Sequence, residues 1–313
     1  MPPRLRLAPF PTHRLYSTQI EPLIRVTNLP AQSTGHIRVL ELNRPKARNA
    51  ISKDLLAAIR AQVDDVERQY GPDGRETGLN SPGARPHLGP TRALVLASAV
   101  DTCFCAGADL KERRGFTQAE TAEFLTDLRG TFTALSELQI PTISAISSLA
   151  LGGGLELALS THFRVLSSNA TVGLPETRLG IIPGAGGTAR LPAIIGLPRA
   201  RDLILTGRRV AAPEAYFLGL ADRLVEVVSQ GDDGQRDADL LQMARKSALA
   251  EAVRLAQEIC EGGPVAIRAA LQAVAWARQD KENEMYERVV ATEDRDEALR
   301  AFQEKRKPVF KGR

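Results

Sequence analysis

Strand-like and helical segments alternate along this chain, and the alternation restricts its fold more than any other feature. Runs at 36–42, 93–97, 141–146 and 163–166 have the length and apolar content of strands, the first as an alternating, half-buried strand. Helical patterns cover 118–138 and 155–160, and strands joined through helices run parallel with right-handed connections. The sequence therefore predicts an α/β fold. After the first run, Ser52 is a suitable N-cap for a helix whose apolar residues are Leu55, Leu56, Ile59, Val63 and Val66.

The chain divides into a leader, a core and a helical C-terminal section. Residues 1–16 contain arginines and no acid, which is typical of a mitochondrial transit peptide and predicts cleavage near Tyr16; the alternative is a disordered tail. The α/β core is expected over 35–228, with the first strand at His36, an exposed Gly- and Pro-rich insert at 71–90 and a loop at 172–187. After a polar linker at 229–239, helices are expected over 240–261, 264–279 and 281–305. This section, 238–313, is either a separate domain or an oligomerisation arm.

Composition excludes several classes of protein. The chain has 41 Lys and Arg against 37 Asp and Glu, and three of the arginines precede the first acid, so the remainder is nearly neutral and no basic nucleic-acid surface is implied. Three cysteines without paired spacing or nearby histidines predict core thiols and no metal site. The uncharged stretch 143–155 is too short to cross a bilayer, so no membrane span is expected.

A glycine triplet opens the helix expected at 155–160. Gly152, Gly153 and Gly154 leave backbone N–H groups unobstructed at a helix N-terminus, where an anion or oxyanion can bind. Taken alone, the triplet favours another explanation, namely a tight turn or close packing of strand and helix. Glu156 favours a functional site, because a carboxylate on an otherwise apolar helix is costly to bury unless it is paired or used.

Two other turns carry candidate residues. Glu176 lies in a glycine-rich stretch at 173–188, which lacks the lysine of a phosphate-binding loop and the spacing of a dinucleotide site. Taken alone, Glu176 is an ordinary acid at the start of a helix after Pro175. The small residues at 106–109 let a ligand approach bare backbone, although Asp109 can equally cap the following turn.

Taken together, these segments resemble the crotonase (enoyl-CoA hydratase/isomerase) superfamily. The matching stretches are 42–50, 104–112, 149–156 and 174–192, in the family's order and spacing. Any one of them is a weak signal, but four in register are specific. The resemblance covers about 38–311 and implies the crotonase-like (ClpP/crotonase) spiral fold of ββα units with a helical C-terminal section.

The resemblance also implies an active site for acyl-CoA thioesters. The N–H groups of Ala108 and Gly153 would form an oxyanion hole, in which each donor typically contributes roughly 3–4 kcal/mol to stabilising the developing enolate. Glu156 and Glu176 occupy both positions that hydratases fill with glutamate. Hydration needs one group to activate water for attack at Cβ and another to protonate Cα. We assign Glu156 mainly to the first role and Glu176 mainly to the second, with one water shared between them.

CoA itself would be held by residues from two turns and by the C-terminal helix, the latter often donated by a neighbouring subunit. From the residues alone, that C-terminal helix end is equally a solvent-exposed charged segment. Because CoA is part of the substrate, no cofactor and no metal are expected. The predicted CoA contacts are Arg48, Ala50, Ala106, Asp109, Leu110, Lys111, Phe302 and Lys305.

Within the superfamily, the resemblance is greatest to the branch that hydrates 3-methylglutaconyl-CoA in leucine catabolism, through 105–113, 149–159 and 308–312. It implies a hydro-lyase of the mitochondrial matrix that forms a homo-oligomer, expected as a hexamer built from two trimers. The alternatives are a short-chain enoyl-CoA hydratase of fatty-acid β-oxidation, a Δ3,Δ2-enoyl-CoA isomerase and a non-catalytic RNA-binding member. RNA binding is not expected, because the segment corresponding to a lysine-rich helix is acidic here, at 64–68.

Two pairs of residues depart from the family's pattern. Ser147 and Ser148 stand where Asn or Asp followed by Gly is usual, and Thr161 and His162 replace a small residue followed by Asp. We expect these departures to affect the turn before the active-site helix and the polar contacts of Arg164.

Overall fold

The computed structural model describes residues 21–32, 34–77, 88–228 and 236–313. The predicted transit peptide at 1–16 lies outside these residues, as do 78–87 of the insert and 229–235 of the predicted linker.

Two β-sheets form the centre of the described structure. Neighbouring strands are parallel, except that β1 pairs antiparallel with β2 and β8 pairs antiparallel with β9. The larger sheet has the order β1 (Ile24–Pro30), β2 (His36–Leu42), β3 (Thr91–Ser98), β5 (Thr142–Ile146), β7 (Phe163–Ser167) and β10 (Arg223–Val225). The smaller sheet has the order β4 (Cys103–Cys105), β6 (Leu149–Leu151), β8 (Thr171–Gly173) and β9 (Arg209–Ala211).

Helices separate the strands and make up the C-terminal section. The first group is η1 (Pro45–Ala47), α1 (Lys53–Glu67), α2 (Leu110–Arg113), α3 (Gln118–Ser136), α4 (Gly153–Leu159), η2 (Glu176–Leu179), α5 (Gly187–Ile195), α6 (Leu197–Thr206) and α7 (Ala212–Phe217). The second is α8 (Arg236–Ile259), α9 (Pro264–Trp276), α10 (Gln279–Val290) and α11 (Glu293–Gln303). None of the described helices is both long and apolar enough to span a membrane.

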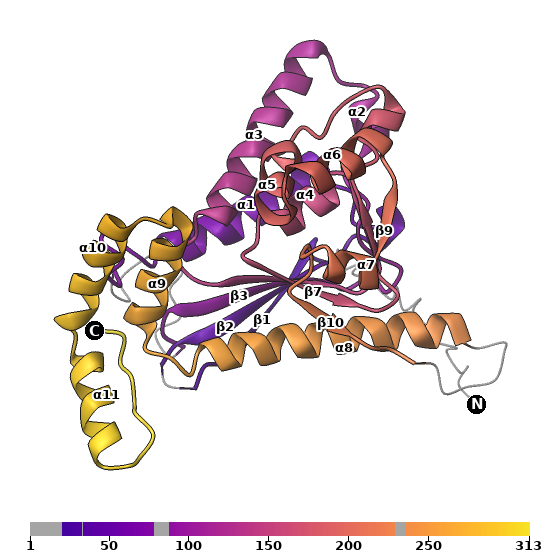
Figure 1. Ribbon diagram of the computed structural model, residues 1–313. Helices are drawn as coiled ribbons and strands as arrows, with labels where there is room; N and C mark the ends of the chain where they lie inside the picture. Colours follow the sequence, from indigo (N-terminus) through magenta and orange to yellow (C-terminus); the bar gives the residue numbers. More distant parts are fainter. Residues whose placement is uncertain (1–20, 33, 78–87, 229–235) are drawn as a thin grey trace, which may run out of the picture.

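A strand–strand–helix unit recurs along the core. A strand of the larger sheet leads into a short strand of the smaller sheet and then into a helix: β3–β4–α2, β5–β6–α4 and β7–β8–η2. Figure 1 labels β3 and β7 of the larger sheet and the helices α2 and α4. This repetition confirms the predicted α/β class and the spiral of ββα units. Because β4, β6 and β8 are neighbours, the turns that follow them lie close together, and these turns carry the candidate site residues.

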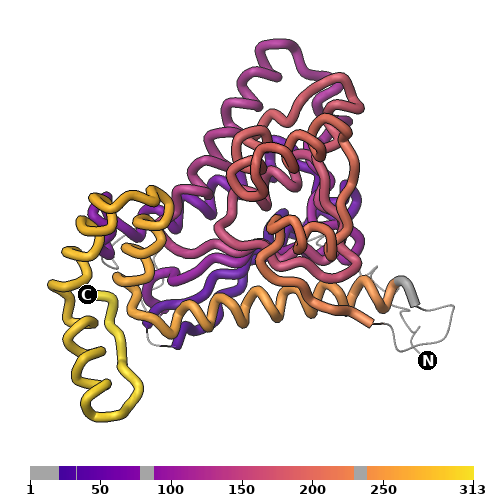
Figure 2. Tube along the Cα trace, in the orientation of Figure 1, coloured from indigo at the N-terminus to yellow at the C-terminus, as the bar shows by residue number. Residues whose placement is uncertain are grey.

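Both faces of the larger sheet are covered. Along β3, Leu94 and Leu96 face a core shared with α1 and α3. The alternate residues, Ala93, Val95 and Ala97, face α8. Figure 2 shows α8 running along the sheet on the opposite side from α1 and α3. The prediction of a half-buried strand at 36–42 is therefore wrong in one respect: β2 is buried on both faces, and its Arg38 is paired with Asp65.

Several elements differ from the sequence prediction. The core begins earlier than residue 35, because β1 is an additional edge strand whose side chains are mostly exposed and carry no apolar alternation. The predicted loop at 172–187 contains the end of β8 and all of η2, and the chain after it includes two more short strands. The single helix expected at 281–305 is two helices, because Thr292 caps α11 by accepting a hydrogen bond from the Arg295 N–H.

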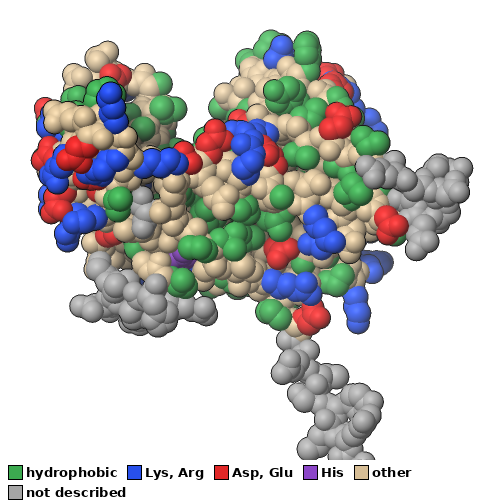
Figure 3. Space-filling view, turned by 90° about the horizontal axis from the view of Figure 1, so that it is seen from below, with side chains coloured by type: hydrophobic (Ala, Val, Ile, Leu, Met, Phe, Trp, Pro, Cys, Tyr) green, Lys and Arg blue, Asp and Glu red, His purple; other side chains and the backbone are tan. Residues whose placement is uncertain are grey.

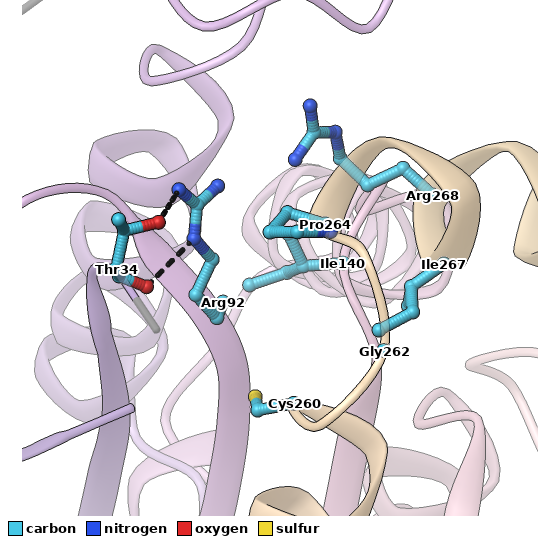
Figure 4. A pocket seen from close by; sticks show the side chains of 8 residues that line it. All are labelled: Thr34, Arg92, Ile140, Cys260, Gly262, Pro264, Ile267 and Arg268. Carbon is cyan, nitrogen blue, oxygen red and sulfur yellow. Dashed lines mark hydrogen bonds between the residues drawn. The ribbon is translucent and has the colours of Figure 1, made fainter. Parts of the chain in front are cut away.

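The C-terminal section is attached to the sheet through buried arginines. Arg92 on β3 donates to the carbonyl and hydroxyl oxygens of Thr34, at 3.0 and 2.6 Å, and pairs with Glu76. Arg268 on α9 donates to the carbonyl oxygen of Gly74 at 3.1 Å. The two arginines line a hollow with room for about one water molecule (Figure 4). The described start of the insert is thus anchored to the fold, rather than simply exposed as predicted.

Charge is mixed on the face that includes α8. Lys and Arg side chains are interspersed with Asp and Glu side chains there, without a continuous basic stripe (Figure 3). On α1, Asp64 forms an ion pair with Arg60, and Asp65 forms ion pairs with Arg38 and with Arg68, the residue that caps the helix.

Packing of α4 against β4 leads to a stability prediction. A Cβ at Gly154 would overlap the carbonyl oxygen of Cys105, whereas a Cβ at Gly130, an exposed position of α3, would meet only the end of a flexible Arg60 side chain, at 4.0 Å. Gly154→Ala should therefore lower the free energy of unfolding by about 1–3 kcal/mol. Gly130→Ala should raise it by about 0.5–1 kcal/mol, because alanine favours a helix. Urea unfolding at one protein concentration measures both, and similar effects from the two substitutions would contradict the described packing.

Candidate active site

The helix α4 begins at the glycine triplet. Gly152 is its N-cap residue, with φ of 54°, and Gly153 is its first residue. The Gly152 N–H donates to the carbonyl oxygen of Gly173 at 2.9 Å, which fixes the start of α4 beside β8. The N-terminus of α4 therefore lies where the ends of β4, β6 and β8 meet, and its free N–H groups are directed out of the helix.

Ala108 and Gly153 bring two backbone donors side by side. The Ile51 N–H donates to the Gly107 carbonyl oxygen, and the Ile51 carbonyl oxygen accepts from the Asp109 N–H. Because the Ala108 N–H is opposite to the Gly107 carbonyl in their shared peptide, it points away from Ile51. A Cβ at Gly153 would lie only 3.5 Å from the Ala108 nitrogen. Neither N–H donates a hydrogen bond to any residue that the structure describes. This is the arrangement expected of an oxyanion hole, with the N-terminus of α4 adding partial positive charge.

Glu156 lies one turn into α4 and is buried, with 3% of its surface exposed. Its Oε1 accepts hydrogen bonds from the N–H groups of Ala185, at 2.7 Å, and Gly187, at 2.8 Å. Gly187 opens α5, so the carboxylate sits at a second helix N-terminus. Burial raises the pKa of Glu156, whereas these two hydrogen bonds and the charges of Arg190 and Arg129 oppose the rise.

Glu176 is the first residue of η2 and is 8% exposed. Its Oε2 is buried without a hydrogen-bond partner among the described residues. A Cβ at Gly152 would lie 2.9 Å from its Oε1, so the carboxyl group packs against the backbone immediately before Gly153. Burial, followed by repulsion from Glu156, raises the pKa of Glu176 to about 7.

The two glutamates and the two backbone donors therefore form one constellation. Oε1 of Glu156 is held by two amide donors, whereas Oε2 of Glu176 is buried without a described partner, so their environments differ although both are buried. A pair of carboxyls with raised pKa values beside two free N–H groups is suited to moving protons on a substrate whose carbonyl becomes an oxyanion.

The two turns predicted to contact CoA are joined through their backbones. The Ala106 N–H donates to the Arg48 carbonyl oxygen at 3.1 Å, and the Arg48 side chain, Ala106 and Lys111 are exposed beside the site. Leu110 is also exposed and Ala50 is half-buried. These positions are open to a ligand, and their contact with CoA stays a prediction.

Asp109 is the exception among these residues, because its carboxylate is already engaged. It caps α2 by accepting from the N–H groups of Lys111 and Glu112, and it accepts from Arg44 at 2.7 Å. Burial opposes ionisation of Asp109, but the hydrogen bonds from Arg44 and from the α2 backbone outweigh it and lower the pKa. Its side chain therefore does what the alternative interpretation predicted, namely capping the next turn.

Phe302 and Lys305 are not brought to the site within one chain. Phe302 is 84% exposed on α11, and Lys305 is exposed just after that helix ends. Figure 1 shows α11 standing well away from α4. A contact with CoA would have to be made in a neighbouring subunit's site, which remains a prediction.

Other residues of the site escaped the sequence prediction. Asn49, fully buried, donates to the hydroxyl of Ser98 and the carbonyl of Phe104, and accepts from the Arg44 N–H, which organises the turn at 44–50. The donors at Ala185 and Gly187 are backbone N–H groups, so no side chain in the sequence indicates their role. The glycine-rich run at 184–187, which precedes a helix, was the available signal.

The cysteines are core thiols, as predicted. All three are buried and free, and burial raises their pKa values. Cys105 donates to the Asn49 carbonyl at 3.0 Å, which ties β4 to the same turn.

The departures from the family's pattern are accommodated unequally. Arg164 keeps a full set of partners, including Asp222 at 2.9 Å and the carbonyls of Leu220 and Thr161 at 2.8 Å. The Nδ1 atom of His162 is hydrogen-bonded to the Thr142 hydroxyl, and burial lowers the pKa of His162 to about 4. The hydroxyls of Ser147 and Ser148, by contrast, are buried without partners among the described residues.

Comparisons with known proteins agree with this geometry. A family model described as enoyl-CoA hydratase/isomerase matches residues 89–313. The chain is 67% identical to "Methylglutaconyl-CoA hydratase 1, mitochondrial" of Pyricularia oryzae, over 96% of this chain and 91% of that protein. It is 56% identical to an "Enoyl-CoA isomerase/hydratase" of Zymoseptoria tritici, over 95% and 90%. The crystal structure of an enoyl-CoA hydratase from Bacillus anthracis is similar with a TM-score of 0.75 and 35% identity, covering 93% of this chain and all of that one.

The raised pKa of Glu176 predicts a pH-dependent cost in stability. Below its ordinary value of 4.5 the carboxyl is protonated in both folded and unfolded chains. Between 4.5 and about 7 the unfolded chain ionises first, so the native state is penalised increasingly, by roughly 3 kcal/mol above pH 7. Glu176→Gln should remove this penalty, so its stability relative to wild type should rise from pH 4.5 to 8. Unfolding by urea across this range measures the difference, and a pH-independent difference would contradict the burial of an ionisable Glu176.

Proposed function

The chain belongs to the enoyl-CoA hydratase/isomerase family, and we propose that it adds water across the 2,3-double bond of an enoyl-CoA thioester, with 3-methylglutaconyl-CoA as its substrate. The observation that carries the proposal is the presence of two buried glutamates, Glu156 and Glu176, beside the paired N–H groups of Ala108 and Gly153.

In this mechanism the thioester carbonyl accepts hydrogen bonds from Ala108 and Gly153. Attack by water at Cβ moves the electron pair of the double bond through Cα toward the carbonyl oxygen, whose negative charge the two donors stabilise. Because both donors belong to the backbone of packed elements, they need little reorganisation as the charge develops. Each donor contributes roughly 3–4 kcal/mol to such stabilisation.

The two glutamates divide the proton transfers. Oε1 of Glu156 is held by Ala185 and Gly187, which leaves Oε2 to take a proton from the attacking water. Glu176, with a pKa of about 7, is partly protonated near neutral pH and can deliver its proton to Cα. Glu156 gains one proton and Glu176 gives one up. A proton transfer from Glu156 to Glu176 through a shared water therefore restores the starting state.

An isomerase needs only to move a proton between two carbons, and isomerases of the superfamily often keep a single glutamate. The retention of both Glu156 and Glu176 therefore favours hydration over double-bond migration. Hydration is redox-neutral, so the proposal involves no cofactor besides the CoA of the substrate and no metal.

The substrate assignment is supported by the relative from Pyricularia oryzae, which is named a methylglutaconyl-CoA hydratase. On this basis we place the enzyme in leucine catabolism. That relative is also named mitochondrial, which agrees with the acid-free, arginine-containing leader at 1–16 and supports a location in the mitochondrial matrix.

We also propose a homo-oligomer, a hexamer built from two trimers, in which α11 supplies Phe302 and Lys305 to a neighbouring site. Phe302 is 84% exposed in the single chain, and a large apolar side chain exposed in this way supports an interface with a neighbouring subunit that would bury it. A role in RNA binding is not proposed, because Arg38 and Arg60 are paired with acids of α1 and leave no excess positive charge there to bind phosphate.

The catalytic assignment predicts the effect of removing each carboxyl group. Glu156→Gln and Glu176→Gln should each lower kcat by roughly 100-fold or more, because each loses one proton transfer. Binding of the CoA ester should persist, since the oxyanion donors and the CoA turns are unchanged. Glu123→Gln, at an exposed position on α3, is the matched control. Stopped-flow turnover and calorimetric binding of a non-reactive acyl-CoA measure the two quantities, and near-normal turnover in both site variants would remove the mechanism.

The substrate is tested by comparing 3-methylglutaconyl-CoA with crotonyl-CoA. Loss of the enoyl-thioester absorbance gives kcat/KM for each, and the proposal predicts a clear preference for 3-methylglutaconyl-CoA. A preference for crotonyl-CoA would keep the mechanism but assign the enzyme to fatty-acid oxidation. Absence of turnover on both would contradict the proposed function.

A further inference from the structure

Arg190 places a positive charge near a helix N-terminus, which is electrostatically unfavourable. It lies in the first turn of α5, where a cation opposes the partial positive charge of the helix N-terminus. Its side chain is half-buried and reaches back toward the start of the helix, where Nη1 donates to the Ala185 carbonyl oxygen at 2.9 Å. The guanidinium fills the space that a Cβ at Gly186 would occupy, and Gly186 has a φ of 105°. Glycine at 186 is therefore required both by the backbone and by Arg190.

Three consecutive carbonyl groups in this turn accept hydrogen bonds, two of them from arginine side chains. The Gly184 carbonyl accepts from Arg129 Nε at 2.7 Å, the Ala185 carbonyl accepts from the Arg190 side chain, and the Gly186 carbonyl accepts from the Arg190 N–H at 2.8 Å. In a trans peptide the N–H points opposite to the carbonyl of the preceding residue. Arg129 thus directs the Ala185 N–H, and the helical hydrogen bond at Gly186 directs the Gly187 N–H. The Arg190 side chain holds the peptide between these two and packs against Gly186, so it fixes the turn that carries both donors.

Those N–H groups belong to Ala185 and Gly187, the two donors that hold Oε1 of Glu156. We propose that Arg190, assisted by Arg129, is a positioning residue for hydration: it holds the 184–187 turn in the conformation whose N–H groups orient Glu156. This inference rests on the proposed function, because it gives Glu156 its role in activating water.

The charges around Glu156 come from three elements. Arg190 of α5 and Arg129 of α3 favour its ionised form, and Glu176 of η2 is the neighbouring acid. Arg190 itself faces Glu156 and Glu137 at the end of α3. Loss of the charge at 190 should therefore make Glu156 harder to ionise, so that the acidic limb of the kcat profile moves to higher pH.

The test compares Arg190→Gln, Arg190→Lys and Arg129→Gln with wild type. Arg190→Gln should lower kcat on the order of 10–100-fold and move the acidic limb upward, with KM within about twofold because no substrate contact is lost. Arg190→Lys should restore the position of the acidic limb and part of kcat. Arg129→Gln should also lower kcat, because it frees the Gly184 carbonyl, but it should move the acidic limb less than Arg190→Gln does. The control is Arg201→Gln, at an exposed arginine on α6 with no hydrogen bond or ion pair to a described residue.

Unchanged kcat and an unchanged acidic limb in Arg190→Gln would overturn the proposal. So would a loss that Arg190→Lys does not reduce and that leaves the limb in place, since this indicates a purely structural role. Hydrogen exchange of the peptide spanning 183–189 tests the positioning independently of turnover. Faster exchange is expected in Arg190→Gln than in wild type or Arg201→Gln, and equal rates would overturn the inference. An inactive wild type that shows this difference would instead remove the proposed function and keep the positioning role.

Discussion

Placing two carboxyl groups in an apolar interior is the constraint on which the rest of this active site depends. Burial of an ionised carboxylate costs several kcal/mol unless donors replace the lost water. Glu156 obtains such donors from the N-terminus of α5, whereas Glu176 has a buried oxygen without any described partner. The difference separates their chemistry: Glu156 is oriented by hydrogen bonds that oppose the effect of burial on its pKa, and Glu176, with a pKa of about 7, is partly protonated near neutral pH.

Glycine makes this arrangement sterically possible. At three positions another group lies where a Cβ would be. The carboxyl of Glu176 lies against Gly152, the carboxyl of Glu156 lies against Gly187, and the backbone of β4 lies against Gly154. The ββα repetition brings the turns that carry these glycines to one place, because β4, β6 and β8 are neighbours in the smaller sheet. Fold and site are thus consequences of the same close backbone approaches.

The sequence predicts the parts of the structure that leave a signal in side chains. The Ser52 cap and the apolar stripe of α1 are both found, and the two glutamates stand out because acids are rare in glycine-rich or apolar surroundings. The edge strand β1 left no such signal, since most of its side chains face solvent. The short strand β8 ends in glycine and reads as a loop, and the break before α11 depends on a single capping threonine.

Within the site, the parts that were not predicted act through the backbone or through long-range contacts. Ala185 and Gly187 contribute only N–H groups, and Arg190 acts on a carbonyl five residues earlier in the chain. Asp109 shows the converse, because a residue proposed for ligand contact has its side chain engaged by Arg44 and the start of α2. Residues whose position follows from local capping are read from sequence more securely than those whose partners come together only in the folded chain.

The paired glutamates are proposed to add water rather than to move a double bond. The most direct measurement is turnover of an enoyl-CoA in ¹⁸O-labelled water, followed by mass spectrometry of the acyl product. We predict a 3-hydroxyacyl-CoA that carries the label at Cβ in wild type and almost none in Glu156→Gln. An isomeric enoyl-CoA without label, formed at a rate comparable to substrate loss, would contradict the account.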